Sequence, residues 1–202
     1  MVNENDIYLV MSTVAILHEI PEPKNINIKD FEKLLSPPIN AVASLPVGML
    51  ISSQRDQVEI LIANNKTDFR DLSGKKDFSS GKIVELVEYF VSELQLKINT
   101  YGINFILKVN RSRSDRWIVE NILCSEISKK TGKKLLGGKG TISMKSGRKT
   151  WNIEFEASEV DKIGVNFNAT EKGDKVPSDG ALTTEIKRQW NSLVKLLGDL
   201  NL

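Results

Sequence analysis

Apolar side chains recur at every second position on both sides of a turn within residues 141–156, and this alternation constrains the fold more than any other feature of the chain. Ile142 and Met144 alternate with polar residues on the first arm. After the turn SGRK, Trp151, Ile153 and Phe155 do the same on the second arm. Successive side chains of a strand point to opposite faces, so the pattern predicts an antiparallel hairpin with one apolar and one polar face.

The rest of the chain divides into segments of two kinds. Short apolar runs predict strands at residues 7–17, 48–53, 57–63, 103–109 and 163–169. Apolar residues at helical spacing predict helices at residues 27–35, 81–98, 115–130 and 183–200. The polar stretch FRDLSGKKDFSSG, residues 69–81, is expected to be a loop.

These segments predict an α+β fold, with one or two antiparallel sheets covered by long amphipathic helices. Residues 1–100 form a β-α-β-β-α half, and residues 101–202 form a β-α-β-β-β-α half. The two halves either are separate or form one continuous domain. The order β-α-β-β-α occurs twice, which indicates an internal duplication. Coincidence is the alternative, because no repeat of individual residues accompanies the pattern.

The counts of cysteine and histidine exclude several kinds of site. The chain has one cysteine, Cys124, and one histidine, His18. It therefore cannot form an intrachain disulfide, and it lacks the ligands of a zinc site. A Ser-His-Asp or Cys-His arrangement would need His18, which we interpret as a strand-end histidine without a catalytic role. Cys124 lies among apolar residues of a predicted helix, where we expect a buried and inert thiol. The absence of a disulfide fits a reducing compartment. We expect no metal.

The apolar segment Ile7–Leu17 is the one candidate for a targeting signal. An acidic flank precedes it, no small-residue cleavage pattern follows it, and eleven residues are too few to cross a bilayer. We therefore interpret it as a buried strand, and we expect a cytoplasmic protein without a membrane contact.

No recognisable catalytic or cofactor motif is present. The stretch GGKGT at residues 137–141 resembles a phosphate loop, but its lysine precedes the last glycine and a strand follows instead of a helix. The triplets EPK and EIK match part of a nuclease signature, but they fall in a predicted turn and a predicted helix. We therefore expect a non-enzymatic protein without a cofactor. A pocket built from Asp, Glu, Lys or Tyr remains the enzyme alternative.

Positive charge is concentrated in the middle of the chain. The whole chain has a net charge of +2, whereas residues 101–149 hold twelve basic and three acidic side chains. Apart from Lys108, these cations are our candidate residues for binding a partner or nucleic acid: Arg111, Arg113, Arg116, Lys129, Lys130, Lys133, Lys134, Lys139, Lys145, Arg148 and Lys149. They form three sets: before and at the start of the helix predicted at 115–130, after that helix, and at the hairpin tip.

We interpret the chain as a binding or accessory protein that acts through a surface, with residues 108–149 meeting an acidic partner. That partner is an acidic protein surface or, as the alternative, a nucleic acid whose phosphates the cations neutralise. The first hundred residues hold more acidic than basic side chains, so a second copy of the chain is a further candidate partner, which would give a homodimer. Lysine-rich sheet edges also occur simply to prevent aggregation, so the charge alone does not decide.

Overall fold

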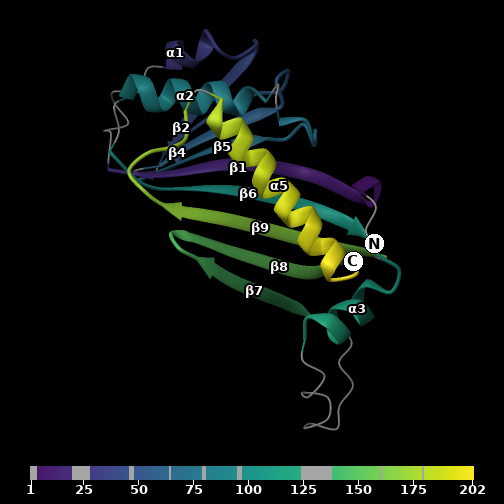
Figure 1. The fold of residues 1–202 in the computed structure, drawn as a ribbon. Coiled ribbons are helices and arrows are strands. Elements are labelled where there is room, and N and C mark those ends of the chain that lie inside the picture. Colours follow the sequence, from purple (N-terminus) through teal and green to yellow (C-terminus); the bar gives the residue numbers. More distant parts are fainter. Residues whose placement is uncertain are drawn as a thin grey trace.

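The fold is described from a computed structural model of the 202-residue chain (Figure 1). The structure describes residues 4–19, 28–45, 48–63, 65–78, 81–94, 97–123, 138–159, 161–178 and 180–202. Its elements in chain order are η1 (Glu4–Asp6), β1 (Ile7–His18), α1 (Ile28–Glu32), β2 (Ile39–Leu45), β3 (Gly48–Ser53), β4 (Val58–Ala63), β5 (Lys66–Asp71), α2 (Lys82–Leu94), β6 (Ile98–Asn110), α3 (Ser114–Asn121), β7 (Lys139–Ser146), β8 (Lys149–Glu159), β9 (Lys162–Lys172) and α5 (Ala181–Asp199).

All nine strands belong to one antiparallel sheet in the order β2-β3-β4-β5-β1-β6-β9-β8-β7. The long strands β1 and β6 pair at its centre, from Ile7 opposite Val109 to His18 opposite Ile98. Strands from the first half of the chain extend the sheet beyond β1, and strands from the second half extend it beyond β6. The central pair therefore joins both halves into one continuous sheet.

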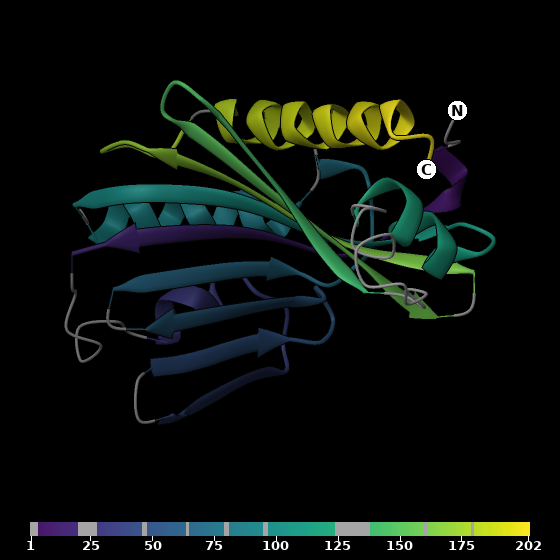
Figure 2. The same ribbon diagram turned by 90° about the horizontal axis from the view of Figure 1, so that it is seen from below.

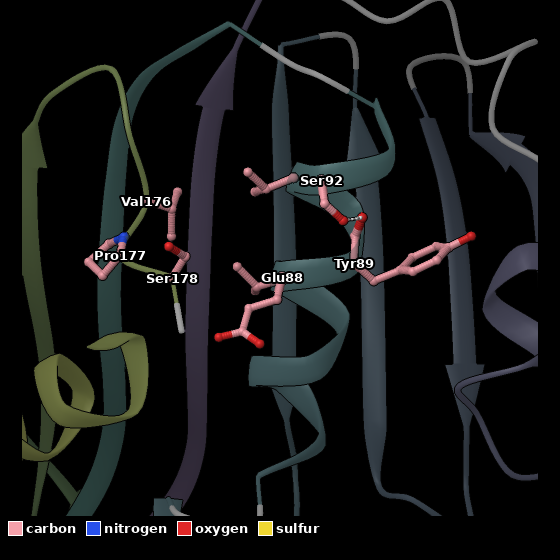
Figure 3. Close-up of a pocket in the computed structure, with 8 residues that line it drawn as sticks. Glu88, Tyr89, Ser92, Val176, Pro177 and Ser178 are labelled. Atoms are coloured by element: carbon pink, nitrogen blue, oxygen red, sulfur yellow. Dashed lines mark hydrogen bonds between the residues drawn. The ribbon is translucent and has the colours of Figure 1, made fainter. Parts of the chain in front are cut away.

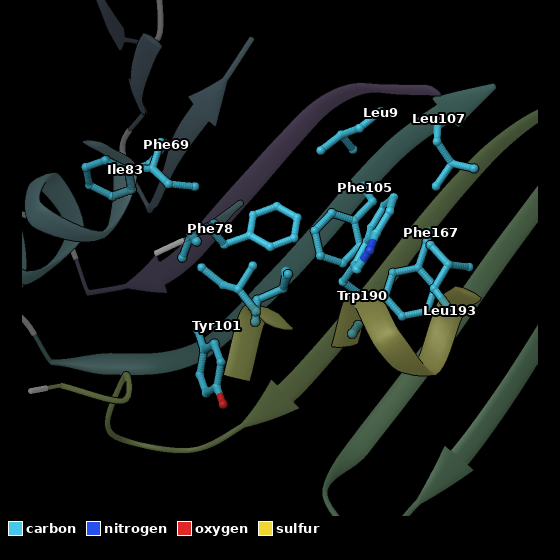
Figure 4. Close-up of a cluster of buried hydrophobic side chains, with 14 of the residues drawn as sticks. Leu9, Phe69, Phe78, Ile83, Tyr101, Phe105, Leu107, Phe167, Trp190 and Leu193 are labelled. Carbon is cyan, nitrogen blue, oxygen red and sulfur yellow. The ribbon is translucent and has the colours of Figure 1, made fainter. Parts of the chain in front are cut away.

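The helices cover one face of this sheet. Helix α2 contacts β5 and β1, α5 contacts β6, and α3 contacts β8, and Figures 1 and 2 show α2 and α5 on the same side. The core lies between these helices and the sheet (Figure 4). Phe105 of β6 lies at its centre, with ring centroids 5.8 Å from Phe167, 5.4 Å from Trp190 and 5.6 Å from Phe78. Aromatic pairs at these separations stabilise a core beyond their buried area.

The expected fold class was wrong in its balance of helix and sheet. The prediction was a sheet or sheets covered by long amphipathic helices, but a single nine-stranded sheet dominates the structure. The helix expected at 81–98 spans thirteen residues, and within the described residues the helix expected at 115–130 ends at Asn121 after eight. The repeated β-α-β-β-α order is also wrong, because the first half contributes five strands rather than three.

Two strands were missed for local reasons. Strand β5 lies partly in the predicted loop, because its sequence KTDFRD is mostly polar. It forms a strand nonetheless, since β1 and β4 pair with it on both sides and provide partners for its backbone groups. Strand β2 was missed because two prolines precede it and a third follows it, and prolines are typical of a break between elements rather than of a strand.

Candidate nucleic-acid interface

The side of the sheet away from α2 and α5 is covered by none of the helices that the structure describes. We call it the open face. Side chains alternate along β8 as far as Ala157 and along β9, so that Ile153 and Phe167 point into the core while their neighbours Asn152 and Asn168 point to the open face. The open face is therefore built from the polar half of each alternating strand.

Polar residues form an uninterrupted row across the open face. One residue from each of the nine strands lies directly opposite the next: Asn40, Ser52, Glu59, Arg70, Thr13, Asn104, Asn168, Asn152 and Ser143. Neighbouring strands lie about 4.8 Å apart, so the row is about 38 Å long. We call it the polar row.

The half of the row on β6–β9–β8–β7 consists of amides and a hydroxyl. Asn168 donates a hydrogen bond from Nδ2 to Oδ1 of Asn104 across the β6–β9 pair. Thr170 Oγ1 donates to Oδ1 of Asn168 at 2.7 Å, and Ser143 Oγ donates to Oδ1 of Asn152 at 2.8 Å. These contacts fix the orientation of the amides before any partner binds.

The other half of the row carries balanced charges. Arg70 of β5 lies 3.3 Å from Oε2 of Glu59 and 3.8 Å from Oδ2 of Asp68. Lys66 also contacts Asp68, at 2.9 Å. Two cations and two carboxylates thus neutralise one another, and this half of the open face is polar without a strong net charge.

Three apolar residues of β1 are exposed at some distance along the strand from the row. Tyr8, Val10 and Leu17 expose 51%, 45% and 39% of their surface. The register of β1 against β6 shifts between Leu9 and Met11, so Val10 lies in a bulge. Bulges re-aim side chains at the places where they occur. Strand β1 therefore adds exposed apolar side chains on both sides of the polar row.

A shallow hollow of about 210 Å³ lies on the open face near the ends of β6, β8 and β9. Gly164 leaves the space above β9 free, and Lys108, Glu154, Glu156 and Asn166 line it. Lys108 forms an ion pair with Glu159. Hydrogen bonds from Lys108 and Lys162 lower the pKa of Glu159 to about 2, so this carboxylate stays ionised across the neutral range.

The first predicted basic set is brought together. Arg111, Arg113 and Arg116 line a second hollow of about 310 Å³ between the end of β6 and α3. Trp117 lines the same hollow but is buried, with its ring 6.0 Å from Phe155. This hollow lies at the end of the sheet beside α3, so it is separate from the polar row.

The hairpin-tip set is divided between the two faces. Lys145 and Arg148 are exposed and have no ion-pair partner among the described residues, and Lys145 lies on the open face opposite Thr150. Lys149 points to the helix face, where its Nζ lies 2.9 Å from Glu171 and 2.9 Å from Glu185. Lys149 therefore joins β8 and β9 to α5 rather than meeting a partner.

The remaining predicted cations do not complete a single patch. Lys139 begins β7, at the far end of the strand from Lys145, and its Nζ lies 2.7 Å from Glu154. The hydrogen bond that Lys139 donates to Glu154 raises the pKa of Lys139. The other four candidates lie outside the described residues: Lys129, Lys130, Lys133 and Lys134.

The helix face carries a further hollow, of about 300 Å³, between α2 and the connection from β9 to α5 (Figure 3). Val87, Val91, Val176 and Pro177 make its lining largely apolar. The nearby Ser92 hydroxyl donates to the carbonyl oxygen of Tyr89 within α2. Because this hollow lies on the helix side, it contributes nothing to the open face.

The asparagines of the polar row were missed by reasoning from sequence. Asparagine is depleted in strands, yet Asn104, Asn152, Asn166 and Asn168 all lie at outward positions of predicted strands. Four such residues in three strands were a signal of a polar surface. What the sequence does not contain is the strand order that places Asn104, Asn168 and Asn152 side by side.

Comparisons with known proteins leave the family open. No family model and no curated protein matches the chain. Among solved structures, Methanococcus jannaschii TBP is similar over 97% of this chain and 98% of its own length, at 12% sequence identity and a TM-score of 0.41. A similarity this low establishes neither a family nor an activity. None of the described helices is long and apolar enough to cross a membrane.

Proposed function

We propose that this protein binds nucleic acid through the open face of its sheet and acts as a binding protein rather than an enzyme. The observation that supports this most directly is the polar row, with three asparagines in register on a face that no described helix covers. The basic residues of the sequence then belong to the margins of the interface rather than to its centre.

The chemistry of the row suits base edges. An asparagine side chain presents one donor and one acceptor group side by side, which matches the edge of adenine, and hydroxyl groups accept either pattern. Asn152 and Asn166 are exposed, and no amide Nδ2 partner is found for either among the described residues. Their amide donors are therefore available to a partner.

The flanking residues supply the remaining contacts. Tyr8 is half exposed about 13 Å along the strands from the row and offers a ring face for stacking, which is tolerant of base identity. Lys145 and Arg148 are exposed cations at one margin and are suited to phosphates. Most other cations of this face already contact carboxylates, as Lys139 contacts Glu154.

This arrangement determines how affinity should depend on salt. Each neutralised phosphate contributes about −0.9 to the slope of log K against log salt concentration for a duplex. Since few cations at the open face lack a carboxylate partner, we expect a shallow slope of about −2 to −4. An interface dominated by the whole basic segment would instead give a slope steeper than about −6.

The test is fluorescence anisotropy with labelled duplex and single-stranded oligonucleotides at about 50 mM salt, a concentration at which phosphate contacts are strong. The double variant Asn152→Glu/Asn166→Glu places two negative charges on the open face, and we expect it to lose at least tenfold in affinity. Asn191→Glu is the matched control, because Asn191 is exposed on α5 on the opposite side.

Equal affinities for the two variants would contradict the proposal, as would the absence of binding to both nucleic acids at low salt. The homodimer alternative is checked in the same samples by light scattering. A dimer mass that the double variant abolishes would assign the open face to a second copy of the chain instead.

A further inference from the structure

We propose that the hollow lined by Arg111, Arg113 and Arg116 binds a phosphate monoester, the doubly charged form of phosphate that terminates a strand or a small metabolite. If the phosphate is the end of a nucleic-acid strand, this inference rests on the proposed function. If it belongs to a free small molecule, the inference stands without it. The hollow measures about 310 Å³, enough for a phosphate and part of the group attached to it.

The backbone of the loop that carries two of these arginines is fixed by one residue. The backbone N–H of Arg111 donates to the carbonyl oxygen of Asp161 at 2.8 Å, and the N–H of Arg113 donates to Oδ1 of Asp161 at 2.8 Å. Both Arg113 and Asp161 have positive φ angles, 57° and 61°. Non-glycine residues rarely adopt this conformation, and where they do, strain is often held at a functional site.

The third arginine is oriented by its own helix. Nε of Arg116 donates to Oε1 of Glu120 at 2.6 Å, one turn further along α3. This contact leaves the two terminal nitrogens of the guanidinium for another acceptor, and it raises the pKa of Arg116. A guanidinium held in this way presents paired donors to a phosphate.

The balance of charge favours a dianion. Glu120 neutralises Arg116, whereas the guanidinium groups of Arg111 and Arg113 have no carboxylate partner among the described residues. A phosphate monoester carries about two negative charges at neutral pH, and two arginines compensate them. A phosphodiester carries only one, so an internal phosphate of a nucleic acid would fit the hollow less well.

A second observation comes from Trp117, which lines the hollow and is 4% exposed. Its indole N–H is buried and has no hydrogen-bond partner among the described residues. The indole nitrogen exposes less than 1 Å², so it is closed off from the hollow and does not donate to a ligand there. Trp117 therefore supplies an apolar wall, and the contacts to a phosphate are left to the arginines.

The experiment measures binding of inorganic phosphate, of a nucleoside 5′-monophosphate and of its parent nucleoside by calorimetry. In parallel, it compares 5′-phosphorylated with 5′-hydroxyl oligonucleotides by anisotropy. The double variant Arg111→Ala/Arg113→Ala removes both unpaired guanidiniums. Arg55→Ala is the matched control, because Arg55 is an exposed arginine in the turn between β3 and β4.

We expect the double variant to lose at least tenfold in affinity for the phosphate monoester, with Arg55→Ala unchanged. Binding of the monophosphate and of inorganic phosphate, with no preference among oligonucleotides, would identify a free small phosphate as the ligand. A threefold or greater preference for the 5′-phosphorylated strand that the double variant removes would identify a strand end.

The proposal is overturned if the wild type binds no phosphate and shows no 5′-phosphate preference, or if the double variant binds as the wild type does. Should no oligonucleotide bind at all, the proposed function fails while the small phosphates still decide this inference. Arg113→Lys is a second variant that keeps the charge and removes the paired donors, and thermal unfolding verifies that each variant is folded.

Discussion

Asn168 donates a side-chain hydrogen bond to Asn104 across the central part of the sheet, where the two residues lie directly opposite each other on β9 and β6. Thr170 donates in turn to Asn168. Three side chains of the open face therefore hold one another in place without help from a helix. A surface whose polar groups are already oriented loses less entropy when it binds a partner.

The first prediction concerns this network. We expect Asn168→Ala to lower the free energy of unfolding by about 0.5–1.5 kcal/mol, because it leaves Asn104 and Thr170 without their shared partner. Urea denaturation measures the change. Asn166→Ala, two residues away on the same strand and exposed, should change stability by less than about 0.5 kcal/mol. Equal effects of the two substitutions would show that the network contributes nothing.

Lys149 should prove to be a structural residue rather than a contact for a partner. Lys149→Met keeps the aliphatic stem but leaves Glu171 and Glu185 without their common cation, so we expect a loss of about 1–2 kcal/mol in the free energy of unfolding. Arg148→Met removes an exposed cation and should leave stability unchanged while weakening nucleic-acid affinity. If Arg148→Met lowered stability and Lys149→Met only weakened nucleic-acid affinity, our description of the hairpin tip would be contradicted.

Acid should destabilise the protein through the same carboxylates. Burial raises the pKa of Glu185, but hydrogen bonds from Arg188, Gln189 and Lys149 more than offset it, and the net pKa lies below its ordinary value of 4.5. Burial also raises the pKa of Glu171, but its hydrogen bonds from Lys149 and Tyr101 outweigh this effect, so the pKa of Glu171 is lowered as well. In the unfolded chain both groups bind protons at higher pH than in the fold.

Their contribution to stability is therefore complete above pH 4.5, the pKa of the unfolded chain, and it declines as the pH falls below that value. Urea denaturation between pH 6 and pH 3 measures this decline. In Lys149→Met the decline should be smaller, because the lysine is one of the groups that lower both pKa values. An unchanged pH profile in this variant would count against the ion-pair network.

His18 should produce a separate dependence on pH. Burial lowers its pKa below 6.5, although the hydrogen bond to the carbonyl oxygen of Glu19 opposes this in part. The neutral ring lies between Thr67, 3.0 Å from Nε2, and the ring of Phe90. Stability should be complete above pH 6.5 and decrease as the pH falls below it, because the unfolded chain takes up the proton first. His18→Gln should abolish this decrease between pH 7 and pH 5.

The sequence predicted those elements whose own pattern determines them. The hairpin of β7 and β8 follows from alternation alone, and α5 follows from its apolar stripe, which includes the buried Leu193. Strand β5 could not be predicted in the same way, because pairing with β1 and β4 stabilises it rather than its own composition. Short polar strands depend on their neighbours, and those neighbours are distant in sequence.

The residues of the candidate surface also differ in how far the sequence alone predicts their positions. Arg111, Arg113 and Arg116 are five residues apart at most, so their proximity is local and the sequence indicates it. Lys149 carries the same charge, but its position in β8 turns its side chain to the helix face. There it pairs with Glu171 and Glu185, which come from elements distant in sequence, and the sequence does not indicate these contacts. The polar row depends on the register of all nine strands, a property of the whole sheet.

The most direct test of the open face is an NMR titration of the isotope-labelled protein with an oligonucleotide. If the open face binds nucleic acid, the side-chain amide signals of Asn152, Asn166 and Asn168 and the backbone signals of β6, β8 and β9 will shift, while those of α2 and α5 remain unchanged. Shifts confined to α2 and α5, or no shifts at concentrations where anisotropy detects binding, would contradict the account.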